Sequence, residues 1–505
     1  MNEPIVKTSR GAVRGRDEQG VATFKGIPFA APPVSQRRFA APVPPQPWDG
    51  VREASAFSPT PPQVDLSARR MPGLDLSPIV GEGWSRGEDY LTLNIWTPDP
   101  GAHRLPVMVF LYGGGFVAGG SSTPLYSGAR FARDGVVLVS MNYRLGSEGF
   151  LPLDGGETNV GLRDQIAALT WVQDNIAAFG GDPNKVTIFG ESAGALSVDT
   201  LLAVPSAAGL FHRAISQSGG AQHTMSIEQA ARVAARLGEI LGINPTRESF
   251  ASLSSEQLVD AQSQMLPGSL DLTTARDADP TGGLTLFLPV RDGDLISAQP
   301  VEAIRRGASA TVDLLIGTNS QEMNLYFVPT GFLNLIGNDE AVCASIRGRH
   351  PEPEKLVAAY RASRPGASSG ELFSAIMTDW MFSIPSVRLA EAHAPHAGGT
   401  YLYEFAWPSP AFDNKLEACH GLELGFVFDN LDTPGLTGPK GLVGENPPAE
   451  LARRVHHTWI TFATTGDPGW VPYNTQQRSV MRINTTWETL TDPRPVERQA
   501  WDGAR

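Results

Sequence analysis

The chain has 505 residues and a formal net charge of −13 at neutral pH. Nucleic-acid binding usually needs a basic face or stripe, so this acidic balance argues against it. No apolar window approaches the roughly 18 uninterrupted residues of a membrane-spanning helix, and the first residues lack the apolar region of a secretory signal. These features argue against nucleic-acid binding and membrane insertion, and they indicate a globular protein with a large core.

The first hundred residues are rich in proline and turn residues, yet aromatic side chains such as Phe24, Phe39 and Trp48 recur among them. Disordered segments are poor in aromatic residues, so a flexible tail would not show this composition. We therefore predict an ordered, loop-rich N-terminal layer over about residues 1–100.

From about residue 105, short apolar runs alternate with longer helical patterns. Continuous apolar runs are typical of strands that are buried on both faces of a mostly parallel sheet. The predicted strands cover residues 106–111, 136–139, 186–189 and 312–316. Helical periodicity covers residues 162–178, and a second helix is predicted between an N-cap at Ser226 and a stop at Gly242. The alternation of strands and helices predicts an α/β fold.

Residues from about 320 to 460 are more helical and less regular than the segment before them. We predict that they form a helical insertion or cap over the sheet. Residues 1–505 are then expected to form a single domain, since no linker-like segment or internal repeat divides the chain.

The run Gly190-Glu191-Ser192-Ala193-Gly194 fits the pattern G-x-S-x-G. The pattern alone is weak, but here it follows a predicted strand and opens a helix of small residues. That setting places a nucleophilic serine on a sharp turn with its hydroxyl exposed, and the turn leaves no room for Cβ atoms close by. Ser192 is therefore the predicted nucleophile, and an ordinary glycine-rich turn is the competing interpretation.

A serine nucleophile also needs donors for the oxyanion that forms during its attack. Residues 112–116 (YGGGF) directly follow a predicted strand and match the glycine-rich loop that completes an oxyanion hole in α/β-hydrolases. This match predicts the backbone N–H groups of Gly114, Gly115 and Ala193 as the donors. A nucleotide-binding loop is disfavoured, because no Gly-Lys-Ser/Thr follows the glycines.

Residues 179–194 (FGGDPNKVTIFGESAG) resemble, position for position, the signature of the type-B carboxylesterases. Residues 88–94 (EDYLTLN) resemble a second mark of that family, and further similar segments span nearly the whole chain. The sequence is thus similar to the bacterial type-B carboxylesterases, the group that includes p-nitrobenzyl esterase and is related to the cholinesterases. The resemblance implies an α/β-hydrolase fold with a mostly parallel central sheet, helices on both faces and helical insertions.

The family order of serine, glutamate and histidine implies the partners of the nucleophile. The segment GTNSQE resembles the family's segment around the triad acid, which implies that Glu322 orients the histidine, although Gln321 and Met323 depart from the family pattern. His420, in the segment CHGLELGFVF, resembles the catalytic histidine. The other histidines that follow Glu322 lack this glycine-flanked context.

Two further residues have supporting roles by resemblance. Glu191 resembles an acidic residue that supports the active-site network in cholinesterases, and Ser218 resembles a serine that hydrogen-bonds the triad acid. A purely structural role is the alternative for each of them.

Only two cysteines occur, Cys343 and Cys419, which favours free thiols and a reducing compartment. Secreted members of the family pair two cysteines at places that hold Tyr90 and Pro61 here. The joint absence of both cysteines fits a cytoplasmic protein.

The resemblance and the predicted site together imply a carboxylic ester hydrolase that acts on small-molecule esters through an acyl-enzyme, without a metal or an organic cofactor. Hydrolysis of amides or carbamates by the same triad remains an alternative. An inactive, neuroligin-like binding protein is a second one, but such members typically lose the nucleophilic serine. The sequence does not indicate an oligomeric state.

In cholinesterases, two phenylalanines narrow the acyl pocket shortly before a Phe-x-Pro-Val stretch. Residues 283–290 (GLTLFLPV) match that stretch. Counting without gaps places Gly283 and Thr285 where those rings would stand, with Phe287 beside them. We therefore hypothesise a roomy acyl pocket that admits longer or aromatic acyl groups, unless other side chains close it.

Overall fold

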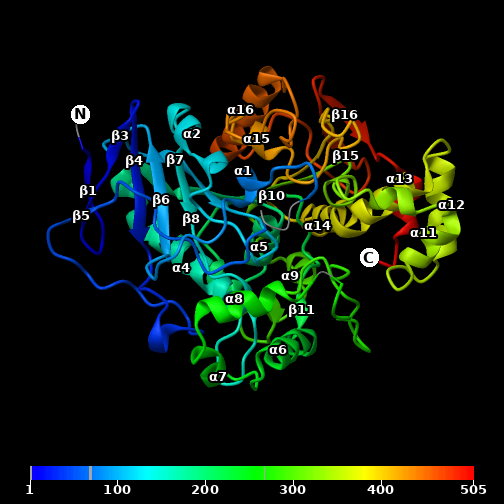
Figure 1. Cartoon of the computed structure of the whole chain (residues 1–505). Coiled ribbons are helices and arrows are strands. Elements are labelled where there is room, and N and C mark those ends of the chain that lie inside the picture. The colour runs from blue at the N-terminus through cyan, green and yellow to red at the C-terminus, as the bar shows by residue number, and fades with distance from the viewer. Residues whose placement is uncertain (1–2, 67–70, 267) are drawn as a thin grey trace.

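A mixed sheet of eleven strands forms the centre of the computed structural model, which describes residues 3–66, 71–266 and 268–505 (Figure 1). In spatial order the strands are β16 (Glu488–Thr491), β15 (Ser479–Ile483), β14 (Thr400–Phe405), β13 (Asp313–Asn319), β10 (Arg213–Gln217), β9 (Gly181–Glu191), β7 (Leu105–Leu111), β8 (Val137–Met141), β6 (Thr92–Thr97), β4 (Val21–Pro28) and β3 (Arg16–Glu18). Neighbours from β15 to β8 are parallel, and antiparallel pairs extend both edges. The predicted mostly parallel sheet is confirmed.

The central strands coincide with the predicted apolar runs, because their side chains are buried on both faces of the sheet. In β7, for example, Val107, Met108 and Val109 are all fully buried. The register of β9, β10 and β13 places their carboxyl ends at one level, where Glu191 pairs with Gln217 and Gln217 pairs with Gly317. The loops that leave these three strands therefore start from the same edge of the sheet.

Helices cover both faces of the sheet, with α2 and α16 on one face and α4 and α5 on the other (Figure 1). The helices before β13 are α1 (Ser77–Val80), α2 (Ala129–Arg133), α3 (Gly146–Phe150), α4 (Val160–Asn175), α5 (Ala193–Leu201), α6 (Ile227–Leu241), α7 (Arg247–Ala251), α8 (Ser255–Ser263) and α9 (Pro300–Arg305). Those after β13 are α10 (Asn324–Phe327), α11 (Asp339–Ser345), α12 (Pro353–Ser363), α13 (Ser369–Thr378), α14 (Ile384–His393), α15 (Leu424–Val427), α16 (Ala449–Thr465) and α17 (Pro495–Ala500).

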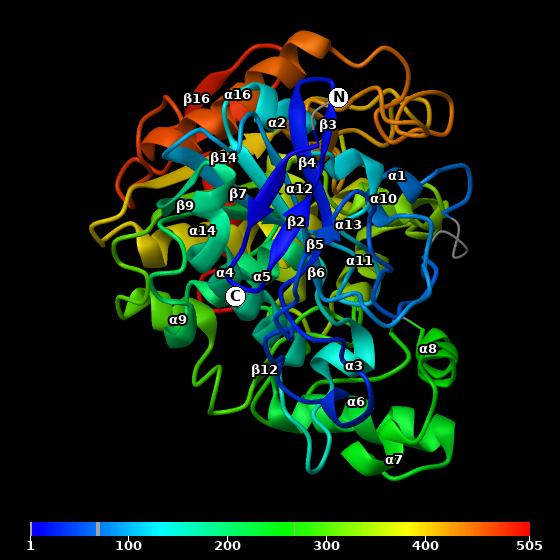
Figure 2. The ribbon, with the colours of Figure 1, turned by 90° about the vertical axis from the view of Figure 1, so that its left-hand side faces the viewer.

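Both predicted helices are present. The periodic segment 162–178 is α4 followed by a 3₁₀ turn over Ile176–Phe179. Helix α6 begins at a capping box, in which Ser226 and Gln229 exchange side-chain to backbone hydrogen bonds, and it ends at Gly242 with φ of 69°. Helices α6, α7 and α8 gather at one end of the molecule in both views (Figures 1 and 2).

The N-terminal hundred residues contribute more to the sheet than a loop-rich layer implies. They form a small sheet of β1 (Ile5–Lys7), β2 (Ala12–Arg14) and β5 (Val51–Glu53), and they also supply β3, β4 and β6 of the central sheet. A two-stranded sheet of β11 (Met225–Ser226) and β12 (Val290–Arg291) lies elsewhere in the chain.

The interval of about 320–460 contains helices α10 to α14, several of which surround a second hydrophobic cluster that includes Trp380 and Trp501. The same interval also contains β14, which pairs with β13 and β15, so part of it belongs to the central sheet. The division of the chain into layers and a cap stays a prediction. Within the described residues, no helix combines the length and the apolar character needed to cross a bilayer.

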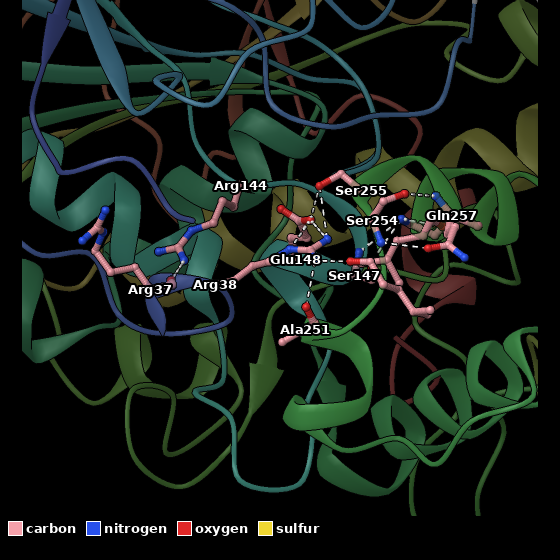
Figure 3. A network of polar contacts seen from close by, with 12 residues as sticks. Arg37, Arg38, Arg144, Ser147, Glu148, Ala251, Ser254, Ser255 and Gln257 are labelled. Atoms are coloured by element: carbon pink, nitrogen blue, oxygen red, sulfur yellow. Dashed lines mark hydrogen bonds and ion pairs between the residues drawn. The ribbon is translucent and has the colours of Figure 1, made fainter. Parts of the chain in front are cut away.

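A polar network ties the N-terminal layer to α3 and α8 (Figure 3). Glu148 of α3 accepts hydrogen bonds from Arg38 Nη2 at 2.6 Å and from Ser255 Oγ at 2.8 Å. The Tyr90 hydroxyl lies 3.3 Å from the other carboxylate oxygen of Glu148. Tyr90 thus makes a hydrogen bond that helps to fix α3.

Candidate active site

Ser192 lies on the turn between the end of β9 and the start of α5. Its backbone adopts φ of 56° and ψ of −124°, a conformation that a residue with a side chain adopts only when its surroundings impose it. A Cβ on Gly190 would lie 2.6 Å from the carbonyl carbon of Gly194, and a Cβ on Gly194 would collide with the Leu111 carbonyl. The tight turn therefore requires both flanking glycines, as the G-x-S-x-G pattern indicates.

Glu322 and His420 are in direct contact although 98 residues separate them in the chain. Their Oε2 and Nδ1 atoms are 2.7 Å apart, and both side chains are buried. The other oxygen of Glu322 accepts hydrogen bonds from Ser218 Oγ at 2.6 Å and from Asn319 N at 2.7 Å. The carboxylate is thus held on both sides, which fixes the orientation of the imidazole.

The second ring nitrogen of His420, Nε2, is directed toward Glu191 next to the nucleophile. It lies 3.2 Å from Glu191 Oε1, but the geometry does not make a hydrogen bond, and neither atom has another partner among the described residues. The serine–histidine hydrogen bond of a triad is therefore not formed in this state. Such contacts are often loose without substrate and tighten in the reacting complex.

Three buried carboxyl groups, those of Glu191, Glu322 and Glu423, surround the imidazole of His420. Burial raises the pKa of Glu191 to about 8, and the neighbouring Glu423 and Glu322 add to this rise. Burial opposes a charged imidazolium, but the carboxylates of Glu191 and Glu322 outweigh it and raise the pKa of His420 to about 9. Glu191 and His420 are therefore coupled in their titration, and the charge on Glu191 contributes to the basicity of the histidine together with Glu322.

The glycine-rich loop after β7 lies against the nucleophile turn, since a Cβ on Gly113 would be 3.1 Å from the Cβ of Ser192. Within the described chain, the backbone N–H groups of Gly114, Gly115 and Ala193 donate to no acceptor. Free, preorganised N–H groups next to a nucleophile are what an oxyanion hole requires. The three predicted donors are thus brought together at the carboxyl edge of the sheet.

The predicted substrate-binding residues Gly283, Thr285 and Phe287 lie beside this loop. Thr285 Oγ1 donates a hydrogen bond of 2.8 Å to the Gly115 carbonyl. Together with neighbouring side chains, the three residues line a cavity of about 50 Å³. The other lining residues are Val64, Val117, Gln262, Met265, Leu284 and Leu286.

At about 50 Å³ the cavity is small, and Met265, Val117 and two leucines contribute to its lining. Gly283 itself adopts φ of 80°, and a Cβ there would lie 2.8 Å from backbone atoms of Gly268. A phenylalanine at position 283 would therefore strain the backbone before it could narrow a pocket. The Cβ side of Gly283 is thus occupied by the backbone of Gly268, and the size of the acyl pocket stays a prediction.

The sequence analysis did not identify a group of buried polar residues that lies next to the predicted triad. Glu423 accepts hydrogen bonds from Asn319 Nδ2 at 2.6 Å and from Gln217 Nε2 at 3.1 Å, and Trp459 Nε1 donates to Gln217 Oε1 at 3.1 Å. Glu423 follows His420 by three residues, and Asn319 lies within the segment around Glu322. A search for polar residues close to the predicted triad would have found both, but not their contact with each other.

A mostly parallel sheet with helices on both faces, and a serine on a strained strand-to-helix turn at its carboxyl edge, define an α/β-hydrolase fold. A family model described as the carboxylesterase family matches residues 2–501. The para-nitrobenzyl esterase of Bacillus subtilis (strain 168) is 38% identical over 99% of this chain and 98% of its own length. The liver carboxylesterase of Sus scrofa is 35% identical over 99% of this chain and 92% of its own length.

Solved structures agree with these relatives. A crystal structure of a carboxylesterase from Geobacillus stearothermophilus superposes with a TM-score of 0.85 at 36% identity and covers 98% of this chain and 99% of its own. A structure of a PNB esterase also gives a TM-score of 0.85 at 36% identity, with 99% of each chain covered. The chain belongs to the carboxylesterase family and is a serine hydrolase of carboxylic esters, which confirms the fold and the activity predicted from the sequence.

Proposed function

We propose that Ser192, His420 and Glu322 hydrolyse small carboxylic esters by two-step acyl transfer. The contact of 2.7 Å between Glu322 Oε2 and His420 Nδ1 carries this assignment, because it leaves Nε2 as the basic nitrogen beside the nucleophile turn. His420 takes the proton of Ser192 as the serine oxygen attacks the ester carbonyl. The proton then passes to the alkoxide that leaves, and water repeats the sequence on the acyl-enzyme.

Gly114, Gly115 and Ala193 are the proposed donors to the oxyanion in both steps. Their N–H groups have no acceptor within the described residues, so they need not break an internal bond to receive the developing charge. Glu322 stabilises the imidazolium that forms when His420 holds the proton. Ser218 and Asn319 support this role because they donate hydrogen bonds to the same carboxylate.

A panel of p-nitrophenyl and p-nitroanilide substrates, in which the ester and the anilide share one acyl group, tests the proposed reaction. We expect turnover of a p-nitrophenyl ester to exceed that of the matching p-nitroanilide and of a p-nitrophenyl carbamate. Faster cleavage of the amide or the carbamate would assign the site to that bond instead. Failure to turn over any of them, together with no labelling by a fluorophosphonate, would indicate a site that is not competent for acyl transfer.

Glu191→Gln is expected to extend ester hydrolysis toward lower pH. His420 must be neutral to accept a proton, so the rate falls as the pH drops through its pKa. The Glu191 carboxylate raises that pKa, and its removal should move the acid limb of kcat/KM down by about one pH unit or more. Profiles of both proteins from about pH 6 to 11 check this expectation. An acid limb that stays in place or moves upward contradicts it, and Glu423→Gln serves as the control for removal of a more distant carboxylate.

The small cavity beside Thr285 is proposed to receive the acyl group of the ester. Met265→Ala should enlarge it, because Met265 is a buried lining residue whose side chain can be removed without touching the triad. We expect kcat/KM for a benzoyl ester to rise relative to that for an acetyl ester by about 10-fold, as apolar pocket contacts are worth roughly 1–3 kcal/mol. Measurement of acetyl, butyryl and benzoyl esters of one alcohol tests this, and an unchanged ranking would place the acyl group elsewhere.

We further propose that the protein functions in the cytoplasm. Cys419 is buried and Cys343 is partly buried, and both are free thiols, as suits a reducing compartment. Cell fractionation with an activity assay on each fraction tests this location.

A further inference from the structure

The oxyanion loop has a backbone that cannot hold its shape alone. Gly114, Gly115 and Phe116 have φ values of 110°, 63° and 60°, so three successive residues lie in the left-handed region. For a bulky residue such as Phe116 this conformation is a rare outlier that costs about 1–3 kcal/mol. The surrounding structure must therefore supply the contacts that maintain the loop.

The carbonyl groups of the loop make those contacts, whereas the N–H groups of Gly114 and Gly115 donate to no acceptor among the described residues. The Gly114 carbonyl accepts from the N–H groups of Val117 and Ala118, each at 3.1 Å. The Phe116 carbonyl accepts from Gly146 N at 2.7 Å, at the start of α3, which the network around Glu148 holds in place (Figure 3). The Gly115 carbonyl accepts from Thr285, which is the one side chain that bonds a carbonyl of residues 114–116 in the described chain.

The hydroxyl of Thr285 carries one proton, so it can donate to only one of two nearby carbonyl groups. Thr285 Oγ1 lies 2.8 Å from the Gly115 carbonyl and 3.4 Å from the Phe287 carbonyl, so the shorter contact to Gly115 takes the proton. The position of Thr285 is itself fixed, because Thr281 Oγ1 donates to the Thr285 carbonyl at 3.0 Å. The segment that contains Thr285 thus delivers one oriented donor to the oxyanion loop.

We propose that Thr285 is a positioning residue for the oxyanion hole. The Gly114 carbonyl bonds fix the peptide plane before Gly115, and the Thr285 hydroxyl fixes the plane after it. The Gly115 N–H lies in the first of these planes, and glycine has little torsional preference of its own, so the Thr285 bond adds a second restraint on how that plane can rotate. This inference rests on the proposed role of Gly115 as an oxyanion donor.

Thr285→Val tests the proposal, because it removes the hydroxyl and keeps the shape of the side chain. Complete loss of an oxyanion donor lowers kcat by about 10²–10³-fold, so a misplaced donor should lower kcat by about 10-fold and leave KM within about 2-fold. The affinity for a boronic acid, which forms a tetrahedral adduct with the serine, should fall by a similar factor. Thr285→Ser keeps the hydroxyl and is expected to retain most of the wild-type kcat.

Thr433→Val is the matched control, since it removes a buried threonine hydroxyl that donates to the Asn430 carbonyl rather than to residues 114–116. A merely structural role of Thr285 would make Thr433→Val and Thr285→Ser as defective as Thr285→Val, and that result overturns the proposal. An unchanged kcat and boronic acid affinity in Thr285→Val also overturns it, while Ser192→Ala still reports whether the proposed nucleophile is correct. Thermal melting is followed for every variant, and Thr285→Ala replaces Thr285→Val if the latter does not fold.

Discussion

Replacement of Ser192 by alanine is expected to lower kcat for a p-nitrophenyl ester by about 10⁴-fold or more, because a triad without its nucleophile retains only the contribution of binding and of the oxyanion hole. The fold should survive, since the change removes one partly exposed hydroxyl and leaves the glycines of the turn intact. Steady-state kinetics and thermal melting of the purified variant measure both expectations. Labelling by a fluorophosphonate should be lost together with activity.

Ser218→Ala is the matched control for this prediction. Ser218 is another serine of the site and is buried, but its hydroxyl bonds Glu322 and belongs to no proposed bond-making step. Its loss should cost about 10-fold or less, as expected for one hydrogen bond to a charged group. If Ser192→Ala kept more than about a tenth of the wild-type rate, or if the fluorophosphonate adduct lay on Ser218, the nucleophile would have been assigned wrongly.

The nucleophile turn could be predicted from the sequence because its geometry is local. A strand, a serine between two glycines and a small-residue helix are adjacent in the chain, and the lack of space around Gly190 and Gly194 explains the glycines. The strands of the central sheet could be predicted for a similar reason, because a strand that is buried on both faces of the sheet has a continuous run of apolar residues. The proximity of Glu322 and His420 is different, because only the resemblance to a family pointed to two residues so far apart in the chain.

The structure of the predicted acyl pocket could not be obtained by counting residues along the sequence. Counting placed Gly283 and Thr285 in the predicted acyl pocket, but it carried no information on backbone torsion or on neighbours from other segments. The positive φ of Gly283 and its contact with Gly268 depend on the local path of the chain, and Met265 enters the cavity from the segment after α8. The hydrogen bond from Thr285 to Gly115 joins residues 170 positions apart and leaves no trace in either local pattern.

Glu322→Gln is expected to lower kcat by about 10³–10⁴-fold with little change in KM, because the glutamine would favour the wrong tautomer of His420. Ser218 Oγ and Asn319 N both donate to one oxygen of Glu322, so a glutamine should keep its carbonyl oxygen at that position. Its NH₂ group would then face His420 Nδ1 and donate to it, which places the ring proton on Nε2. A protonated Nε2 cannot accept the proton of Ser192, so the loss should persist at high pH.

Glu423→Gln separates this effect from the general removal of a buried carboxylate. Glu423 contacts Asn319 and Gln217 rather than a ring nitrogen of His420, and a glutamine can replace it without dictating the tautomer. We expect a loss of about 10-fold or less, since a hydrogen bond to a charged group contributes about 1.5–3 kcal/mol and part of it is retained by the amide. The measurement is kcat and KM for one p-nitrophenyl ester across the pH range, in all three proteins. A fully active Glu322→Gln beside an inactive Glu423→Gln would transfer the orienting role to Glu423, because the acid that sets the tautomer is the one whose amide form cannot turn over substrate.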